Sequence, residues 1–335
     1  MTFKLSNILI ILVVFCILLN GCAFQKKDIN THEGQVILRL AENHVKDYPT
    51  VRADRLFANL VYERTEENIK IIVYPEGKLG DEESVIEQVK FGVIDMARVS
   101  IAPLVTIDES FGVLALPYLY RDKDHMFKVL EGPLGDDFRH SLISNQMYGL
   151  AWYDAGARNF YNSIKEIRVP DDMKYLRIRV QEMDLMKDFV RNIGATPVPL
   201  VFSEVFGAIQ TGIIDGAENN WPSYVSTSHN MVAKYITIGE HIRIPELVII
   251  NKITYDRLTE EQQQIIEECA KEAALYQREE MVKEEEKARE IAIENGSIIT
   301  VLTAEEREQF KSRALPIYES FKSHEDIIEQ ITNTE

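Results

Sequence analysis

The sequence predicts an α/β fold with two domains and one long helix that both domains share. The chain has 335 residues, which suggests roughly two domains of about 150 residues each. Strand-like runs alternate with amphipathic stretches in two separate parts of the chain, as in α/β folds with mostly parallel sheets. A third observation is one helical pattern of about 35 residues. It would form a helix about 50 Å long, which is longer than a small domain needs.

The first alternation follows a short polar stretch, residues 25–35. Apolar runs with period two predict strands, and apolar residues at helical spacing predict helices. Strands are expected at 36–41, 69–74 and 94–100, and helices at 49–62 and 83–91, the second of them opened by Gly80 and Asp81.

The middle of the chain shows a second alternation. Residues 150–154 and 176–180 are strand-like. A helix over 185–193 should end at Gly194, since glycine favours the left-handed C-cap. Ser203 should cap a further helix through Gln210, with Gly212 at its end and residues 213–218 leading into a loop. No internal repeat is evident.

The last third is predicted to be helical. Thr259 and Gln262 have the spacing of a capping box, and the helical pattern that they open continues to Asn295. The mixed charges at 278–290 are typical of a solvated helix face. A second capping box at 303–306 predicts a final helix.

The composition argues against nucleic acid as a partner. The chain has 54 Asp and Glu against 37 Lys and Arg, whereas nucleic-acid-binding proteins usually present a basic face. Hydrophobic residues make up 45% of the chain, which is enough for sizeable cores. Because the overall field repels anions, an anionic ligand would need a local cluster of arginines.

Motifs of catalysis are not found in the sequence. There is no G-x-S-x-G, no H-E-x-x-H and no glycine-rich phosphate loop. The seven histidines are scattered and have no metal-ligand spacing. We therefore expect a protein that is not an enzyme and that holds no cofactor and no metal.

The N-terminus predicts export and lipidation. Lys4 precedes an apolar run of twelve residues at 8–19, which is short of the about 20 that a membrane span needs. This pattern indicates a signal peptide over 1–21. Leu19-Asn20-Gly21-Cys22 resembles the bacterial lipobox, so Cys22 is expected to carry lipid and 22–35 to form a tether. An ordinary signal peptide or an uncleaved anchor is the alternative.

Lipidation of Cys22 would leave Cys269 as the one remaining cysteine of the mature chain. No disulfide and no cysteine-based zinc site is then expected, and the helical pattern around Cys269 predicts a buried bystander. We expect an extracytoplasmic protein held by lipid on the cell membrane, either in a periplasm or on the outer face of the cytoplasmic membrane.

Three arginines could bind a carboxylate. Arg177 and Arg179 lie two apart in a strand and so point the same way. Arg158 follows the strand at 150–154, near the edge where open α/β sheets bind ligands. The planar guanidinium matches a carboxylate in two hydrogen bonds. Surface or ion-paired arginines are the alternative interpretation.

Residues 218–224 place two amides, an indole and a phenol in one predicted loop. Amides can bind hydroxyl groups, and aromatic side chains can form flat walls for sugar-like rings. A tight turn around a packed Trp221 explains the same run equally well.

The order and spacing of several motifs resemble the solute-binding proteins of TRAP transporters, the tripartite ATP-independent periplasmic systems, in their C4-dicarboxylate-binding superfamily. The resemblance covers nearly the whole predicted mature chain. It rests on the residues at 77–81, 85–89, 92, 95–97, 116–121, 156–160, 176–180, 202–206, 208–212 and 215–219.

The family implies two hinged lobes of the periplasmic-binding-protein type that close on a ligand, with a long C-terminal helix spanning both. Lobe I would comprise 36–156 and 245–285, and lobe II would comprise 157–244 and 286–330. The partners that the family implies are the small and large TRAP membrane subunits.

By resemblance, Arg179 clamps the carboxylate of the substrate, Arg158 supports it, and Asn219 hydrogen-bonds the same region. Phe202 would line the pocket. The opposite domain and the motifs of one subgroup add Asn43, Glu82, Ser100, Arg98 and Trp221.

That subgroup binds sugar acids such as glucuronate or galacturonate. This sequence resembles it at residues 42–43, 48–49, 97–100, 151–154 and 219–224. A hexuronate is therefore the expected solute. A C4-dicarboxylate or another organic acid is the alternative within the same class. A sensor that presents its ligand to a receptor kinase is the alternative from a different class.

Overall fold

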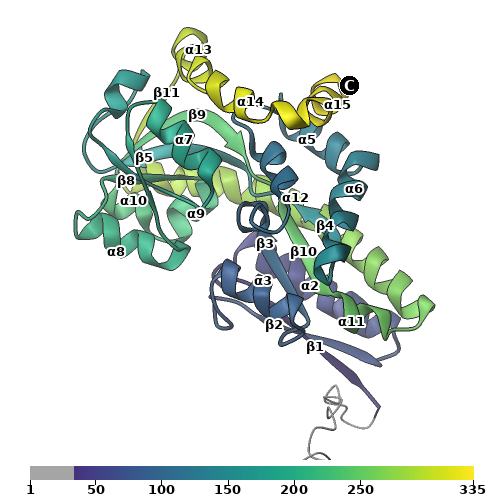
Figure 1. The fold of residues 1–335 in the computed structure, drawn as a ribbon. Coiled ribbons are helices and arrows are strands. Elements are labelled where there is room, and N and C mark those ends of the chain that lie inside the picture. The colour runs from purple at the N-terminus through teal and green to yellow at the C-terminus, as the bar shows by residue number, and fades with distance from the viewer. Residues whose placement is uncertain (1–33) are drawn as a thin grey trace, which may run out of the picture.

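The computed structural model describes residues 34–335, which form two lobes, each built around a β-sheet (Figure 1). The sheet of lobe I has the strand order β2 (Ile69–Tyr74), β1 (Val36–Ala41), β3 (Met96–Ser100), β10 (Glu246–Asn251), β4 (Met147–Tyr153). The sheet of lobe II has the order β11 (Ile298–Val301), β9 (Tyr235–Arg243), β5 (Ala157–Asn162), β8 (Gly216–Asn219), β6 (Arg177–Val180), β7 (Thr196–Pro199).

Both sheets are mostly parallel, as predicted, but each contains one strand that runs against the others. In lobe I, β1 pairs in parallel with β2 and β3, but β10 is antiparallel to both β3 and β4. In lobe II, β5 is antiparallel to β8 and β9. β10 enters the first sheet after the chain has passed through lobe II. Its direction therefore depends on the path through that lobe and not on a local βαβ connection.

Helices connect the strands of each lobe. Those of lobe I are α2 (Pro49–Arg64), α3 (Glu82–Lys90), α4 (Ile101–Leu104), η1 (Glu109–Ala115), α5 (Lys123–Leu130), α6 (Pro133–Ser141), η2 (Leu142–Asn145) and α11 (Lys252–Asp256). Those of lobe II are η3 (Pro170–Met173), α7 (Asp184–Asn192), η4 (Phe202–Glu204), α8 (Val205–Gln210), α9 (Trp221–Ser226) and α10 (His229–Val232).

The C-terminal part is helical, as predicted. It contains α12 (Glu260–Glu294), α13 (Ala304–Ser312), α14 (Leu315–Ser320), η5 (Lys322–His324) and α15 (Glu325–Asn333). Both predicted capping boxes are present, at Thr259 and Thr303. The expected single final helix is wrong, because Arg313 and Ala314 separate α13 from α14 and further helices follow.

Two local predictions in the middle of the chain are also wrong. Ser203 caps no helix: it lies inside η4, and the residue before α8 is Glu204, whose side chain makes no capping hydrogen bond. The expected loop at 218–224 is instead the end of β8 followed by α9, with Asn220 as the N-cap. The Asn220 side chain accepts a hydrogen bond from the backbone N–H of Ser223, which starts a helix that begins with Trp221 and Pro222.

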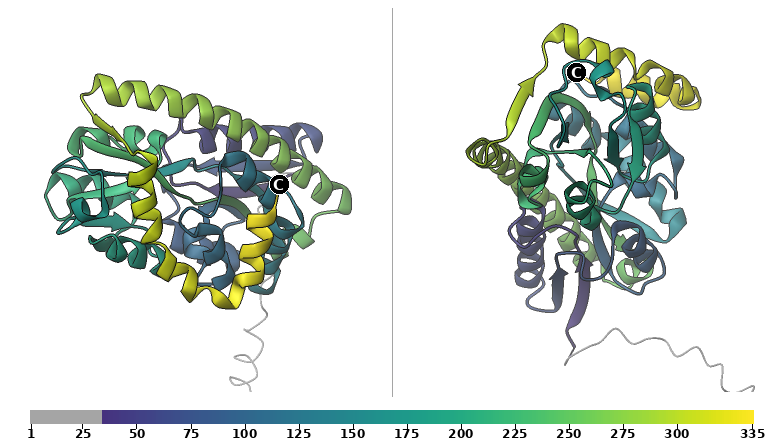
Figure 2. Two further views of the ribbon diagram at one scale, coloured as in Figure 1. Left: turned by 90° about the horizontal axis from the view of Figure 1, so that it is seen from above. Right: turned by 90° about the vertical axis from the view of Figure 1, so that its left-hand side faces the viewer.

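The long predicted helix is confirmed. α12 has 35 residues and runs along both lobes (Figure 2). Its apolar side chains join the core of lobe I through Ile266, Cys269 and Ala273, and the core of lobe II through Ala292. Cys269 is fully buried, and burial raises the pKa of its thiol to about 11, which keeps it protonated and unreactive.

One local arrangement occurs in both lobes. The backbone N–H of Arg39 donates to Asp95 in lobe I, and that of Arg177 donates to Asp215 in lobe II, both at 2.8 Å. The arginine side chain also bonds to the same aspartate in each case. Three residues before each aspartate is a glycine with positive φ, Gly92 or Gly212. The lobes therefore share a structural unit that inspection of the sequence did not reveal.

The predicted division into 36–156 with 245–285 and 157–244 with 286–330 stays a prediction. The chain passes between the sheets after β4 and again after β9. The C-terminal helices run from lobe II to lobe I on another side of the molecule than α12 (Figure 2). There Arg121 donates to the carbonyl of Thr332, and His125 Nε2 lies 2.9 Å from that of Ile331.

Candidate functional site

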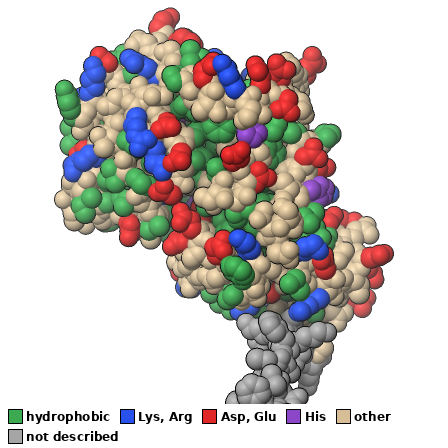
Figure 3. Space-filling model, in the orientation of Figure 1, with side chains coloured by type: hydrophobic (Ala, Val, Ile, Leu, Met, Phe, Trp, Pro, Cys, Tyr) green, Lys and Arg blue, Asp and Glu red, His purple; other side chains and the backbone are tan. Residues whose placement is uncertain are grey.

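A cavity of about 650 Å³ lies between the lobes. Its lining includes seven of the nine binding residues expected from the sequence, namely Asn43, Glu82, Ser100, Arg158, Arg179, Phe202 and Asn219. Figure 3 shows Asp and Glu side chains where the two lobes meet on one face of the molecule.

Neighbouring strands bring the polar groups of lobe II to one edge of its sheet. β8 lies between β5 and β6, and Ala217 is in register with Arg179. Arg158 was expected at the carboxyl end of a strand. It is instead the second residue of β5, and it reaches the same edge as Asn219 because β5 is antiparallel to β8.

Arg158 is neutralised by Glu218. Its Nη2 donates to Glu218 Oε1 at 2.8 Å, its Nε donates to Oε2 of the same carboxylate, and its Nη1 donates to Asn219 Oδ1 at 3.1 Å. Burial alone would raise the pKa of Glu218, but the Arg158 charge outweighs it and lowers that pKa to about 2. The pair therefore carries little net charge toward a ligand.

Arg179 differs from Arg158 in having no such partner. It is 4% exposed, and its Nε donates to the carbonyl of Leu200 at 2.9 Å. Within residues 34–335, no carboxylate lies within ion-pair distance of its guanidinium. Burial lowers the pKa of Arg179, although an arginine stays charged in proteins. It is thus a buried cation whose counter-ion the cavity can receive.

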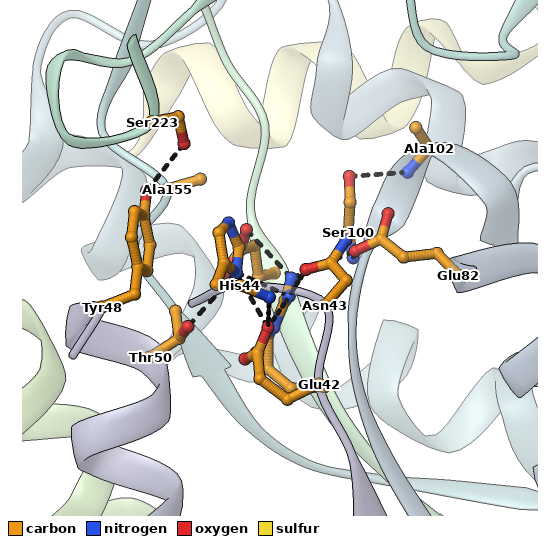
Figure 4. A network of polar contacts seen from close by, with 12 residues as sticks. Glu42, Asn43, His44, Tyr48, Thr50, Glu82, Ser100, Ala102, Ala155 and Ser223 are labelled. Atoms are coloured by element: carbon orange, nitrogen blue, oxygen red, sulfur yellow. Dashed lines mark hydrogen bonds and ion pairs between the residues drawn. The ribbon is translucent and has the colours of Figure 1, made fainter. Parts of the chain in front are cut away.

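Lobe I presents a different wall, organised around Arg98. Arg98 is 1% exposed, and its guanidinium pairs with Glu42, Glu82 and Glu246. It also donates to Asn43 Oδ1. Figure 4 shows the Glu42, Asn43 and His44 side chains of this network, with Glu82 beside Ser100, whose backbone N–H donates to Glu82 Oε1 at 3.0 Å.

Two expected site residues do not line the cavity. Arg98 lies behind the wall, where an ion pair holds Glu82 and a hydrogen bond holds Asn43. Trp221 is partly buried and packs against the core of lobe II, with its ring 6.1 Å from that of Tyr224. Each interpretation of the 218–224 run holds in part, because Trp221 is packed while the two amides, Asn219 and Asn220, line the cavity.

The sequence analysis missed several lining residues, including His44, Gln181 and Glu246, and it gave Asn220 and Ser223 no role beyond their place in the 218–224 run. Glu246 could have been found from the sequence, because it is a charged residue at the start of an apolar run that became β10. Gln181 could not have been found, because its role depends on a contact across the lobes: its Nε2 donates to Ser100 Oγ at 3.2 Å. Tyr48 also bridges the lobes, with its hydroxyl 2.9 Å from Ser223 Oγ (Figure 4).

His229 makes the stability of lobe II sensitive to acid. Burial, with a further contribution from Arg179, lowers its pKa from 6.5 to about 3. Between these values the unfolded chain binds a proton that the folded chain does not, so stability falls as the pH falls. We expect this group to cost about 2 kcal/mol between pH 7 and pH 5. Urea unfolding of the wild type and of His229→Gln at both pH values checks this. Equal pH dependence in the two proteins would contradict the assignment.

Residues 40–324 match the family described as bacterial extracellular solute-binding protein, family 7. The chain belongs to this family. A solute-binding protein from Chromohalobacter salexigens is 32% identical over 291 residues, which cover 87% of this chain and 86% of that protein.

Two solved structures have the same fold. A TRAP periplasmic solute-binding protein from Xanthobacter autotrophicus Py2, with bound β-D-galacturonate, is 36% identical with a TM-score of 0.86 and covers 89% of this chain and 100% of its own. One from Roseobacter denitrificans, with bound β-D-glucuronate, is 34% identical with the same TM-score and the same coverage.

The family 7 assignment agrees with the two-lobed α/β fold and with a binding function rather than an enzymatic one. Members of the family act outside the cytoplasm, as its description states. Among residues 34–335, no helix is both long enough and apolar enough to cross a membrane.

Proposed function

We propose that this solute-binding protein captures a hexuronate or a related sugar acid and delivers it to the small and large membrane subunits of a TRAP transporter. The observation that carries the proposal is Arg179, a buried cation that lines the cavity without an ionic partner among the described residues. A bound carboxylate would supply the missing counter-charge in two hydrogen bonds.

The other expected site residues take supporting roles in this proposal. Arg158 and Asn219 lie beside Arg179 on the same sheet edge and would hold the carboxylate end. Phe202 would form an apolar wall for the sugar ring, and its own ring makes an edge contact with that of His44 from lobe I, at 5.5 Å between centroids. The bound galacturonate and glucuronate of the two structural neighbours support a solute of this size and charge.

A thermal-shift screen of the purified protein against sugar acids and C4-dicarboxylates tests the proposal. A ligand that binds only the folded state adds about 2.7 kcal/mol of stability at 100 times its Kd. We expect glucuronate or galacturonate to raise the Tm. Stabilisation by succinate or malate alone would favour the dicarboxylate alternative and would contradict the hexuronate assignment.

Lipid anchoring is the further part of the proposal. Cys22 and the predicted signal peptide lie outside the described residues, as does most of the 22–35 segment. The support comes from the Leu19-Asn20-Gly21-Cys22 motif after a short apolar run.

We expect Cys22 to be the mature N-terminus and to carry lipid. Mass spectrometry of the N-terminal peptide from native membranes checks this. An unmodified start beyond Cys22, or a retained Met1, would contradict the prediction.

A further inference from the structure

The cavity is lined by many more acidic than basic side chains. Its two arginines, Arg158 and Arg179, both come from lobe II. Its carboxylates are Glu76, Asp81, Glu82, Glu83, Glu182, Glu204 and Glu246. Since Glu218 neutralises Arg158, positive charge is concentrated at Arg179. A ligand that enters the cavity therefore meets a positive charge at Arg179 and mostly acidic side chains elsewhere.

The innermost part of the acidic wall is the pair formed by Glu82 and Glu246. Their Oε1 atoms each lie 3.1 Å from the same nitrogen, Arg98 Nη1. Arg98 also pairs with Glu42, so three carboxyl groups share one guanidinium. If all three are ionised, these four side chains together carry two more negative than positive charges.

Glu246 has hydrogen-bonding capacity left over. Its side chain is 8% exposed, and among residues 34–335 its Oε2 is buried without a hydrogen-bond partner. Burial raises the pKa of Glu246, against the opposing effect of Arg98. A buried polar atom without a partner costs stability, and a ligand hydroxyl group could satisfy a carboxyl group here, as donor or as acceptor.

A second ligand carboxylate at this position would have the opposite effect. It would bring another negative charge against Glu82 and Glu246 in a site shielded from water, where like charges repel strongly. The described residues of lobe I offer it no second arginine, because Arg98 is already shared. Building repulsion against an unwanted ligand is one of the two general routes to specificity.

We propose that Glu246, together with Glu82, binds hydroxyl groups at the end of the ligand remote from Arg179 and excludes a second carboxylate there. The inference rests on the proposed function, because it takes Arg179 as the site of the first carboxylate. It makes the protein selective for hydroxy acids with a single carboxylate over sugar diacids with the same carbon skeleton.

Calorimetric titration with D-glucuronate and D-glucarate, which has a second carboxylate at C1, tests the inference. We expect the wild type to bind glucarate at least about 100-fold more weakly than glucuronate, a repulsion of about 2.7 kcal/mol. Glu246→Gln should lower the ratio of the glucarate Kd to the glucuronate Kd by about 10-fold or more, mainly because glucarate binds more tightly to this variant. Glucuronate forms a pyranose ring whereas glucarate is open-chain, but this difference applies to both proteins alike and cancels when their ratios are compared.

Glu87→Gln is the matched control. It removes the same charge from the same helix, α3, but from an exposed side chain that pairs with Lys90 at the surface and does not line the cavity, so the ratio should stay within threefold of the wild type. Glu82→Gln is a second test variant in case Glu246→Gln folds poorly, which its Tm would reveal. If folded Glu246→Gln and Glu82→Gln both keep the wild-type ratio, or if the wild type binds both ligands alike, the inference is overturned while the proposed function stands. If the wild type binds no sugar acid, both are overturned.

Discussion

Arg179→Ala is expected to weaken solute binding by roughly 30-fold to several thousand-fold. The substitution would leave the ligand carboxylate in a buried site without a counter-ion. Removing one member of a buried charge pair typically costs about 2–5 kcal/mol, and each 1.4 kcal/mol corresponds to about tenfold in affinity. Calorimetric titration with the ligand found by the thermal-shift screen measures the effect.

Arg179→Lys should also bind poorly, because an ammonium group cannot form the planar pair of hydrogen bonds. Arg177→Ala is the matched control. Arg177 lies two residues away on the same strand, but its side chain is 43% exposed and pairs with Asp215 at 2.7 Å. The affinity of Arg177→Ala for the ligand should stay within threefold of that of the wild type. If Arg179→Ala does the same while remaining folded, Arg179 is not the clamp, and Arg158 becomes the next candidate.

Arg98→Met is expected to lower the free energy of unfolding by about 3–5 kcal/mol at pH 7. Arg98 is the common partner of Glu42, Glu82 and Glu246. Removing one member of a buried ion pair leaves an uncompensated charge, which is costly in the protein interior. Urea unfolding of both proteins, monitored by circular dichroism, measures the difference.

The difference should depend on pH in a defined direction. Burial would raise the pKa of Glu42, but Arg98 and His44 hold it well below 4.5 in the folded state. The stabilisation that Arg98 gives Glu42 is therefore fully present above about pH 4.5, the pKa of Glu42 in the unfolded chain. It is lost as the pH falls through the lower pKa that Glu42 has in the folded protein. The gap between Arg98→Met and the wild type should shrink in acid.

Arg64→Met is the control for this experiment. Arg64 pairs with Glu272 on the surface, where the two side chains are 37% and 50% exposed. Such pairs contribute about 0–1 kcal/mol. If Arg98→Met costs no more than Arg64→Met, the Arg98 cluster does not stabilise the lobe as described.

The element types were largely predictable from sequence because they depend on neighbouring residues. The apolar run that became β1, the capping box at Thr259 and the left-handed Gly194 are all local features, and each is present as expected. Ser203 shows the limit of such reasoning. A serine before a helix is a plausible cap, but the preceding η4 turn shifts the start of α8 beyond it.

The candidate site was predictable in part, through motifs rather than through geometry. Arg179 and Arg158 were both expected to face a ligand. The sequence could not tell that Glu218 neutralises one of them while the other has no such partner. Arg98 was likewise expected in contact with the ligand, whereas its three carboxylate partners hold it behind the wall. They come from positions 42, 82 and 246, so only the folded chain assembles them.

The sequence by itself determined the α/β class, the long shared helix and the family, because hydrophobic periodicity, capping residues and motif order are properties of the linear chain. The tertiary structure alone decided the direction of β10, the pairing of Arg158 with Glu218 and the burial of Glu246 in an acidic wall. The physical reason is that charge and burial act through space. The free energy of an ionised side chain depends on the groups within a few ångströms of it, and at this site those groups come from distant parts of the chain.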